Sequence, residues 1–507
     1  MSRPTVDRLI GTPGTDLPGA HGEMGELRGR PKFEAIGVDR IPEAERTSTP
    51  WTFFGILVGQ SLTMSLLVFG WLAITFGLGV WAALSSLAAG TVVGIVLVVP
   101  LMLIGSATAT NNSTASGAHF GVRGRLVGSI VGLAIMIVYT ALGIWGGGQV
   151  TVMILARLFG TPESDLTLAV AYAVLAVGAA FIAIYGYHLM AQVEFALLVL
   201  SVVTFTLIVI AFVGRFDLEY RGGEYLLESF WNTWILSAVV VGLAGPMSLI
   251  TVMGDWSRYI SPSRFPARKL VPVASLAVFI ALMVPSVLGV LLASAFSDPL
   301  ADFFTGLVHE APTWTVAVML PLATVGTIGF VAANMYSAGL DLDAIVPGLT
   351  RPVTTLTATG VATVLVFVGS IVLDARDSIT AVAFILVAIG TPWAAITGIG
   401  YLRCRGRYHL DDLQVFNRHE TGGVYWYANG FNYRAVVAWL AGSIYGCLAI
   451  EATPLYIGPL ADLAGGVDTS FLGSFVIALV VYLGAELAFP ARQPQDTPIA
   501  EKQPSIF

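Results

Sequence analysis

The chain has 507 residues, of which 56% are hydrophobic and 11% are charged, and its mean hydropathy is +0.81. Soluble domains carry roughly 25% charged residues, so this composition excludes a soluble globular protein and indicates an all-α polytopic membrane protein. The net charge is −7, and the two cysteines, Cys404 and Cys447, argue against a disulfide framework and a cysteine-based metal site.

The two ends of the chain are polar. Residues 1–50 are rich in glycine, proline and charge, and they lack the apolar core of a signal peptide. We expect them to form a disordered cytoplasmic tail. Residues 491–507 are expected to form a second, C-terminal cytoplasmic tail.

Between the tails, residues 51–490 read as a transmembrane domain with twelve helices, because about 20 apolar residues span a bilayer. The predicted spans are 51–77, 80–104, 126–156, 165–186, 190–214, 231–254, 269–296, 312–340, 352–373, 378–402, 434–457 and 469–489. All lysines and arginines fall on the side of the N-terminal tail, except Arg157, Arg215, Arg221 and Arg376. This bias predicts a cell-membrane protein with both termini in the cytoplasm.

Spans one and six contain residues that interrupt helices. Span six carries Gly242, Gly245 and Pro246, and span one carries Gly55 and Gly59. Unwound backbone at membrane depth persists only where protein buries it or where it lines a cavity. Paired interruptions at equivalent positions of two repeats indicate a transporter site at mid-membrane. Close helix packing is the alternative, and for Gly55 alone it is the favoured one.

Four stretches, in the same order along the chain, resemble purine–cytosine permeases of the nucleobase:cation symporter-1 family. They are Gly37–Arg46 with Thr49-Pro50-Trp51, His119–Arg125, Gly242–Pro262 with its Gly-Pro-x-Ser break and Asp-aromatic-Ser-Arg-Tyr end, and Ala333–Leu340. The resemblance runs from about residue 37 to residue 490.

The resemblance implies a LeuT-type fold of twelve helices. Helices 1–5 (residues 51–214) and 6–10 (residues 231–402) would form an inverted repeat, followed by two further helices at 434–489. It also implies a secondary active transporter that imports a planar nucleobase, of the cytosine or purine type, by cation symport and alternating access. The family's central site lies between helices 1, 3, 6, 8 and 10.

A neutral heterocycle needs aromatic planes for its faces and a few amides or hydroxyls for its edge. No lysine or arginine lies near the middle of a span, which argues against a carboxylate or phosphate substrate. Four uncharged residues suit the edge of a base: Gln60, Ser61, Ser248 and Asn334. Asn334 either contacts the substrate or joins helices by hydrogen bonding.

Two residues of helix three, Tyr139 and Trp145, are alternatives for the aromatic ring that stacks on the substrate. An ungapped match places the family's stacking tryptophan at Tyr139, whereas Trp145 and Gln149 imitate the Trp-x-x-x-Gln pattern of hydantoin-type members. In helix six the family's second aromatic aligns with Pro246. Trp393 in helix ten is either a lid over the substrate or a core residue.

The coupling cation is also ambiguous. Sodium in this fold would bind hydroxyls of helix eight, where the chain has Thr324 and Thr327, but the family's two ligand positions align with Ile328 and Gly329. The sodium site therefore looks degraded, and proton coupling is the favoured hypothesis.

Glu194 and Asp255 are the candidate proton carriers. Asp255 and Arg258, at the end of helix six, form either an interfacial salt bridge or an inner gate.

Catalytic and nucleotide-binding motifs are missing: the sequence has no His-Glu-x-x-His, no Rossmann Gly-x-Gly-x-x-Gly and no Walker loop. We therefore expect no enzyme, no cofactor, no metal site and no nucleic-acid partner. The expected partners are the substrate, a proton or sodium ion, and the lipid bilayer. An amino-acid carrier or a hydantoin/allantoin-type carrier of the same fold is the alternative.

Overall fold

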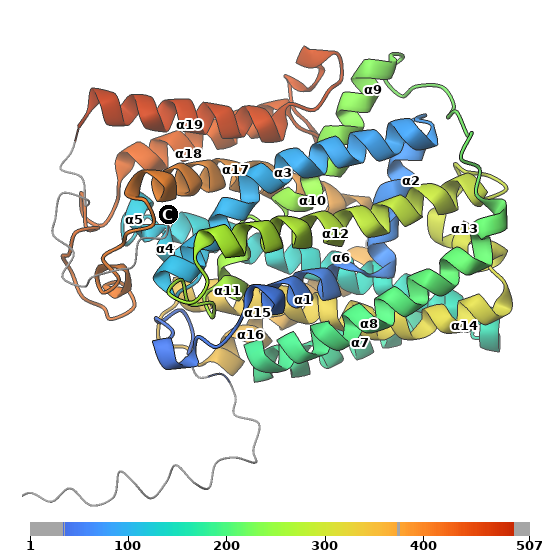
Figure 1. Cartoon of the computed structure of the whole chain (residues 1–507), viewed down its shortest axis with the longest axis horizontal. Helices are drawn as coiled ribbons and strands as arrows, with labels where there is room; N and C mark the ends of the chain where they lie inside the picture. The colour runs from blue at the N-terminus through green and yellow to red at the C-terminus, as the bar shows by residue number, and fades with distance from the viewer. Residues whose placement is uncertain (1–33, 35, 373–375, 491–507) are drawn as a thin grey trace, which may run out of the picture. The chain divides into compact units, whose positions relative to one another are not determined.

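The computed structural model describes residue 34 and residues 36–372 and 376–490, and within these ranges it is almost entirely helical (Figure 1). Residues 1–33 and 491–507, which make up most of the two predicted tails, lie outside the described residues. Residues 36–49 were expected to belong to the disordered tail, but they pack against the helices. Val38, Ile41 and Arg46 are buried there. We call the end of the helix bundle where they lie the inner end, after the predicted topology.

The α-helices are α1 (Pro50–Ser61), α2 (Val68–Thr75), α3 (Val80–Thr108), α4 (Asn112–Ala115), α5 (Gly117–Phe120), α6 (Leu126–Phe159), α7 (Asp165–Tyr185), α8 (Tyr187–Phe212), α9 (Phe230–Ser237), α10 (Ala244–Met247), α11 (Met253–Ser257), α12 (Ala267–Ala295), α13 (Phe303–Glu310), α14 (Thr313–Pro321), α15 (Thr327–Ile345), α16 (Arg351–Val366), α17 (Arg376–Cys404), α18 (Tyr433–Ala449) and α19 (Ser470–Ala488). Three π-helical segments are η4 (Ala238–Leu243), η5 (Leu322–Gly326) and η6 (Phe367–Val372).

The short 3₁₀ helices are η1 (Glu43–Glu45), η2 (Met64–Leu67), η3 (Val213–Arg215), η7 (Asp412–Gln414) and η8 (Ala461–Ala464), and strands β1 (Glu451–Ala452) and β2 (Tyr456–Ile457) pair antiparallel. The last helices, α17, α18 and α19, lie side by side (Figure 1).

Every predicted span overlaps a helix or a chain of helical segments, although the predicted span 434–457 runs past the end of α18 into strands β1 and β2. Within the described residues, ten helical stretches are long and apolar enough to cross a membrane, and the bent pair at the start of the chain gives an eleventh. The predicted eleventh span corresponds to α18, which has only 17 residues. The all-helical membrane fold is confirmed, and the count of twelve spans stays a prediction.

The predicted interruption of span one is present, but it does not fall at the glycines. The chain bends by 76° between α1 and the pair η2–α2, at Leu62 and Thr63, where Thr63 is extended. Gly59 lies inside α1, and a Cβ there would come within 2.1 Å of the backbone oxygen of Glu194 in α8. Gly59 therefore serves the close approach of α1 and α8, and the packing alternative is correct for it.

Span six is interrupted twice. Its helix widens into the π segment η4, continues as α10, and then unwinds into turns between Ser248 and Val252 before the short α11. Pro246 lies against α3, where a Cβ at Gly94 would come within 2.4 Å of its ring. Both predicted helix breaks are therefore confirmed, and both are buried within the bundle, as unwound backbone at membrane depth requires.

Candidate functional site

The two interruptions are flanked by α6 and α15, the helices that correspond to predicted helices three and eight. Ser65 in η2, just after the break in span one, lies against Gly146 of α6. Phe330 of α15 packs onto Gly143, one turn earlier on α6. The segments expected to form the central site therefore contact one another.

Several neutral polar atoms in these segments are buried without a hydrogen-bond partner. Among them are Gln60 Oε1 at the end of α1, Trp145 Nε1 on α6 and Asn334 Nδ2 on α15. Buried polar groups in native proteins are almost always paired, so unpaired ones indicate water, an ion or a ligand. One acceptor and two donors fit the edge of an uncharged heterocycle. Ser61, next to Gln60, is also buried.

Tyr139 and Ser248 are brought together by the unwound part of span six. The Tyr139 hydroxyl lies near the Ser248 side chain. Ser248 Oγ also donates to the backbone oxygen of Gly245 at 2.7 Å. An aromatic face thus lies beside the helix break, as the ungapped match expects, while Trp145 and Gln149 are half-buried further along α6.

The structure does not bring Pro246 and Trp393 to this place. Pro246 contacts α3, as described above. Trp393 is fully buried, and a Cβ at Gly128 of α6 would lie 2.3 Å from its Nε1. Gly128 is about 16 Å along the helix from Tyr139, at 1.5 Å per residue. Trp393 is therefore a core residue at the inner end, which is the alternative to its role as a lid.

A small cavity lies between α2, α3, η4 and α12, but it is not this site. It is lined by Leu66, Phe69, Leu87, Thr91, Val241, Gly242, Gly245, Leu282, Pro285 and Ser286, and it measures about 10 Å³. That volume holds about one water molecule, so no heterocycle fits there.

The two threonines considered as sodium ligands, Thr324 and Thr327, donate their hydroxyls to backbone oxygens one turn earlier in the same span. Thr324 Oγ1 donates to the backbone oxygen of Leu320 at 2.9 Å, and Thr327 Oγ1 donates to that of Ala323 at 2.7 Å. Thr327 also lies against Gly147 of α6 rather than against α1. The contacts of these two hydroxyls therefore give no support for an ion site between them and α1.

Replacing Thr327 by valine is accordingly expected to leave the cation dependence of transport unchanged. The substitution removes one hydrogen bond within the helix, which costs about 1 kcal/mol of stability. Uptake measured with and without sodium at fixed pH checks this. Sodium stimulation that is present in the parent protein and lost in the variant would assign Thr327 to a sodium site.

Glu194 lies in α8 between α1 and α15. Its side chain is fully buried, and neither carboxyl oxygen has a hydrogen-bond partner. A Cβ at Gly329 of α15 would lie 3.1 and 3.3 Å from these oxygens, and the Glu194 backbone touches Gly59 of α1. The carboxyl group is therefore next to one of the two positions where the resemblance expects a sodium-binding hydroxyl.

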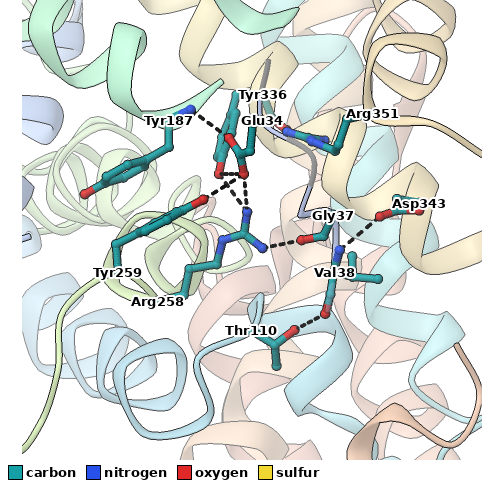
Figure 2. A network of polar contacts seen from close by, with 10 residues as sticks. All are labelled: Glu34, Gly37, Val38, Thr110, Tyr187, Arg258, Tyr259, Tyr336, Asp343 and Arg351. Atoms are coloured by element: carbon teal, nitrogen blue, oxygen red, sulfur yellow. Dashed lines mark hydrogen bonds and ion pairs between the residues drawn. The ribbon is translucent and has the colours of Figure 1, made fainter. Parts of the chain in front are cut away.

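A second polar site lies at the inner end (Figure 2). Arg258 is fully buried and donates from Nη2 to Glu34 Oε1 at 2.7 Å and to the Tyr336 hydroxyl at 2.9 Å. The hydroxyls of Tyr259 and Tyr336 donate to the same Glu34 oxygen at 2.9 and 3.0 Å, and the Tyr187 N–H donates to its other oxygen at 2.7 Å. Glu34 thus has four donors.

Electrostatics keeps this carboxylate charged. Burial by itself raises the pKa of Glu34, but Arg258 and Arg351 lower it, and the hydrogen bonds lower it further, so the pKa lies below its usual value. The salt bridge considered between Asp255 and Arg258 is not formed, since Arg258 pairs with Glu34 and both Asp255 oxygens lack hydrogen-bond partners.

The segment after Glu34 is held by the same end of the bundle. The Val38 N–H donates to Asp343 at 2.9 Å, and the Val38 carbonyl accepts from Thr110 at 2.5 Å. Arg258 also donates to the backbone oxygen of Gly37. Sequence reasoning missed this function of the tail, because its composition resembles a disordered segment and no local pattern marks Glu34 as a partner of Arg258.

A family model, a related protein sequence and solved structures all match this chain to nucleobase permeases or to transporters of the same fold. A family model described as permease for cytosine/purines, uracil, thiamine, allantoin matches residues 40–477. YxlA of Bacillus subtilis (strain 168), provisionally named a purine-cytosine permease, is 23% identical over 462 residues, which cover 89% of this chain and 95% of YxlA.

Two solved structures share the fold. One is Mhp1, a nucleobase-cation-symport-1 family transporter, in a closed conformation with bromovinylhydantoin bound (TM-score 0.67, 17% identity, 92% of this chain and 98% of that chain). The other is a Na⁺-coupled sialic acid symporter in its substrate-bound outward-open state (TM-score 0.59, 12% identity, 88% and 91%). The LeuT-type fold is therefore confirmed, and this multi-pass membrane chain belongs to the cytosine/purine permease family of nucleobase:cation symporters, which are transporters and not enzymes.

Proposed function

We propose that this protein carries a neutral nucleobase or a closely related heterocycle across the cell membrane by proton symport. The observation that carries the substrate proposal is the set of unpaired, uncharged atoms of Gln60, Trp145 and Asn334 beside two interrupted helices. They supply hydrogen bonds without charge, and Tyr139 supplies an aromatic face. Family membership supports the same class of substrate.

A hydantoin or allantoin remains the second candidate, because Trp145 and Gln149 keep the spacing of hydantoin-type members. Mhp1, which shares the fold, was solved with a hydantoin bound. An amino acid is a weaker candidate, since the described residues show no cationic group among those assigned to the site for its carboxylate.

Direct uptake decides between these substrates. Cells expressing the protein are given labelled cytosine, adenine, allantoin and leucine, followed by a competition panel against whichever is taken up. The proposal predicts saturable uptake of cytosine or adenine and competition by other planar bases. Uptake of leucine alone would contradict it, and uptake of allantoin alone would select the second candidate.

Glu194 supports coupling to protons. A buried carboxylate without a cation or hydrogen-bond donor costs several kcal/mol, so the group is neutral in this conformation and holds a proton. No ionisable group acts on it among the residues the structure describes. A proton bound here would replace the ion that the altered sodium ligands at Ile328 and Gly329 no longer hold.

The Arg258–Glu34 network supports alternating access. It joins the tail segment to α8, α11 and α15 at the inner end, so these elements must separate before a substrate can leave there. We propose that Arg258 and Glu34 form the inner gate. Arg258 and Arg351 belong to the predicted cytoplasmic segments, which supports a cytoplasmic location of both termini. We propose the domain order of an N-terminal tail, two five-helix repeats and two final helices.

Replacing Glu34 by glutamine is expected to open this gate more often. Glutamine keeps hydrogen-bond acceptance but leaves the buried guanidinium of Arg258 without its counter-charge, a change that costs about 3–5 kcal/mol in buried ion pairs. A cysteine introduced at the fully buried Ala333 should then react faster with a thiol reagent from the inner side.

The matched control is Glu43→Gln, since Glu43 is an exposed carboxylate at the same end that pairs with Arg46 and Ser261 and not with the Arg258 guanidinium. It should leave the labelling rate unchanged. Equal labelling rates in Glu34→Gln and the parent protein would show that this ion pair does not hold the inner end closed.

A further inference from the structure

Two aspartates, Asp255 on α11 and Asp341 on α15, form a buried acidic pair that the proposed transport cycle does not use. Each is only 1% exposed. They come from different elements that meet at α4. Asn112 packs against Gly254, the neighbour of Asp255, Ser113 donates to Asp341 at 2.6 Å, and the charge of Asp255 acts on Asp341. Two like charges in a dry interior repel each other strongly, so the pair needs a compensating positive charge.

Two hydrogen-bond donors can stabilise a negative charge on Asp341. The Ser113 hydroxyl donates to its Oδ1 at 2.6 Å, and the Asn111 amide donates to the same oxygen at 3.4 Å. Both donors belong to the turn and short helix α4 between α3 and α6. Its Oδ2 has no partner and lies against Gly132 of α6, where a Cβ would approach it to 2.3 Å.

Asp255 is stabilised differently. Arg258 and Arg351 act on it through space, and the Ser337 hydroxyl and the Asn112 backbone N–H lie beside it. Neither of its oxygens has a hydrogen bond of normal geometry. Neither arginine forms an ion pair with it. Arg258 is bound to Glu34 and Tyr336, Arg351 Nη2 donates to the Tyr336 backbone oxygen, and the unpaired Arg351 Nη1 lies against Gly339.

Other buried polar atoms around the pair are also unpaired. They are both side-chain atoms of the Asn112 amide and the hydroxyls of Ser337 and Thr251, all at most 1% exposed. The ionisable groups on the elements packed around the pair are Arg258 directly after α11, Tyr336 and Asp343 on α15, Arg351 on α16, Arg125 before α6, and Glu34 in the tail segment. The helix α4 contributes none.

We propose that Asp255 and Asp341 share one proton and form a second protonation site directly behind the inner gate. The hydrogen bonds to Asp341 and the field of the two arginines at Asp255 stabilise one negative charge between them, but not two. A proton between the carboxyl groups removes the second charge and gives one of the unpaired oxygens a donor. The proton bridges two oxygens and no covalent rearrangement is required.

The position of the pair connects it to the gate. Asp255 lies three residues before Arg258 on α11, and Asp341 lies five residues after Tyr336 on α15. Separation of α11 and α15 during opening would part the two carboxyl groups and admit water, so the shared proton would leave to the inner side. This role in transport rests on the proposed function, whereas the existence of the site does not.

Infrared spectroscopy of the purified full-length protein tests the site without transport. Aspartate labelled with carbon-13 in its side-chain carboxyl separates the absorption of protonated aspartates from that of Glu194. At neutral pH, the parent protein should show a protonated aspartate band that is lost in Asp341→Asn and also in Asp255→Asn, since either remaining acid can carry one charge. Two variants keep the test valid if one of them fails to fold.

The matched control is Asp302→Asn at an exposed helix N-cap, where asparagine caps equally well and the band must persist. A band that survives in both pair variants, or its absence from the parent protein, overturns the proposal. So does a band that appears only when sodium is removed, because sodium would then occupy the pair. None of these results depends on whether Glu194 couples transport.

Discussion

Replacing Glu194 by glutamine should abolish proton-driven accumulation of substrate while leaving substrate exchange across the membrane intact. Glutamine has nearly the size and polarity of the protonated acid, so the buried position between Gly59 and Gly329 is preserved. Glutamine cannot release a proton, so the variant would behave at every pH like the protonated transporter, which can still exchange substrate. One pH unit sustains about a tenfold concentration ratio per proton, and this ratio should collapse to equality in the variant.

The measurement uses proteoliposomes with an imposed pH gradient for accumulation, and counterflow of labelled substrate for exchange. Glu310→Gln is the matched control. Glu310 pairs with Arg215 away from the site, and an exposed ion pair of this kind contributes little to stability. Full accumulation by the Glu194→Gln variant would show that the coupling proton binds elsewhere.

Replacing Asn334 by alanine should abolish saturable uptake at substrate concentrations near the KM of the parent protein, without reducing the amount of protein in the membrane. Its Nδ2 is buried and unpaired in the structure, so its removal leaves no broken hydrogen bond behind in the empty site. The substrate, however, would lose a buried hydrogen bond worth about 1–3 kcal/mol, which lowers affinity by about tenfold to a hundredfold.

Uptake kinetics and surface abundance are measured together for Asn334→Ala. The same substitution at Asn232, in the first turn of α9, serves as the control and should leave both quantities unchanged. Unchanged uptake in Asn334→Ala would remove this residue from the substrate site and assign it to helix packing.

The helices could be predicted from the sequence because hydrophobic length decides where a chain can cross a bilayer. The two interruptions were also predictable, since glycine, proline and polar residues are costly in an apolar helix. Their exact positions were not. In span one the chain breaks at Leu62 and Thr63, because Gly59 is already needed where α1 crosses α8.

Long-range partners are the part that sequence patterns could not supply. Arg258 was expected either in a salt bridge with Asp255 or in an inner gate, but its partner Glu34 is 224 residues away in a segment that resembles a disordered tail. Asp341 was not singled out, since a single acid near a helix end is ordinarily exposed. Only the packing of α4, α11 and α15 reveals that it faces Asp255.

For Trp393, the sequence allowed two roles and could not decide between them. A tryptophan after Thr-Pro in helix ten suits a lid, and only the contact with Gly128 shows that it belongs to the core. Tyr139 and Trp145 stay alternatives for the stacking ring, because a slip of one or two helical turns in the match between the Phe-Gly loop and the site decides between them.

The most direct test of symport is uptake of labelled cytosine or adenine into proteoliposomes under two separate gradients. An inward proton gradient without sodium should drive accumulation that a protonophore abolishes. An inward sodium gradient at equal pH on both sides should drive none. Accumulation that requires sodium and ignores the pH gradient would contradict the assignment of Glu194 as the site that carries the coupling ion.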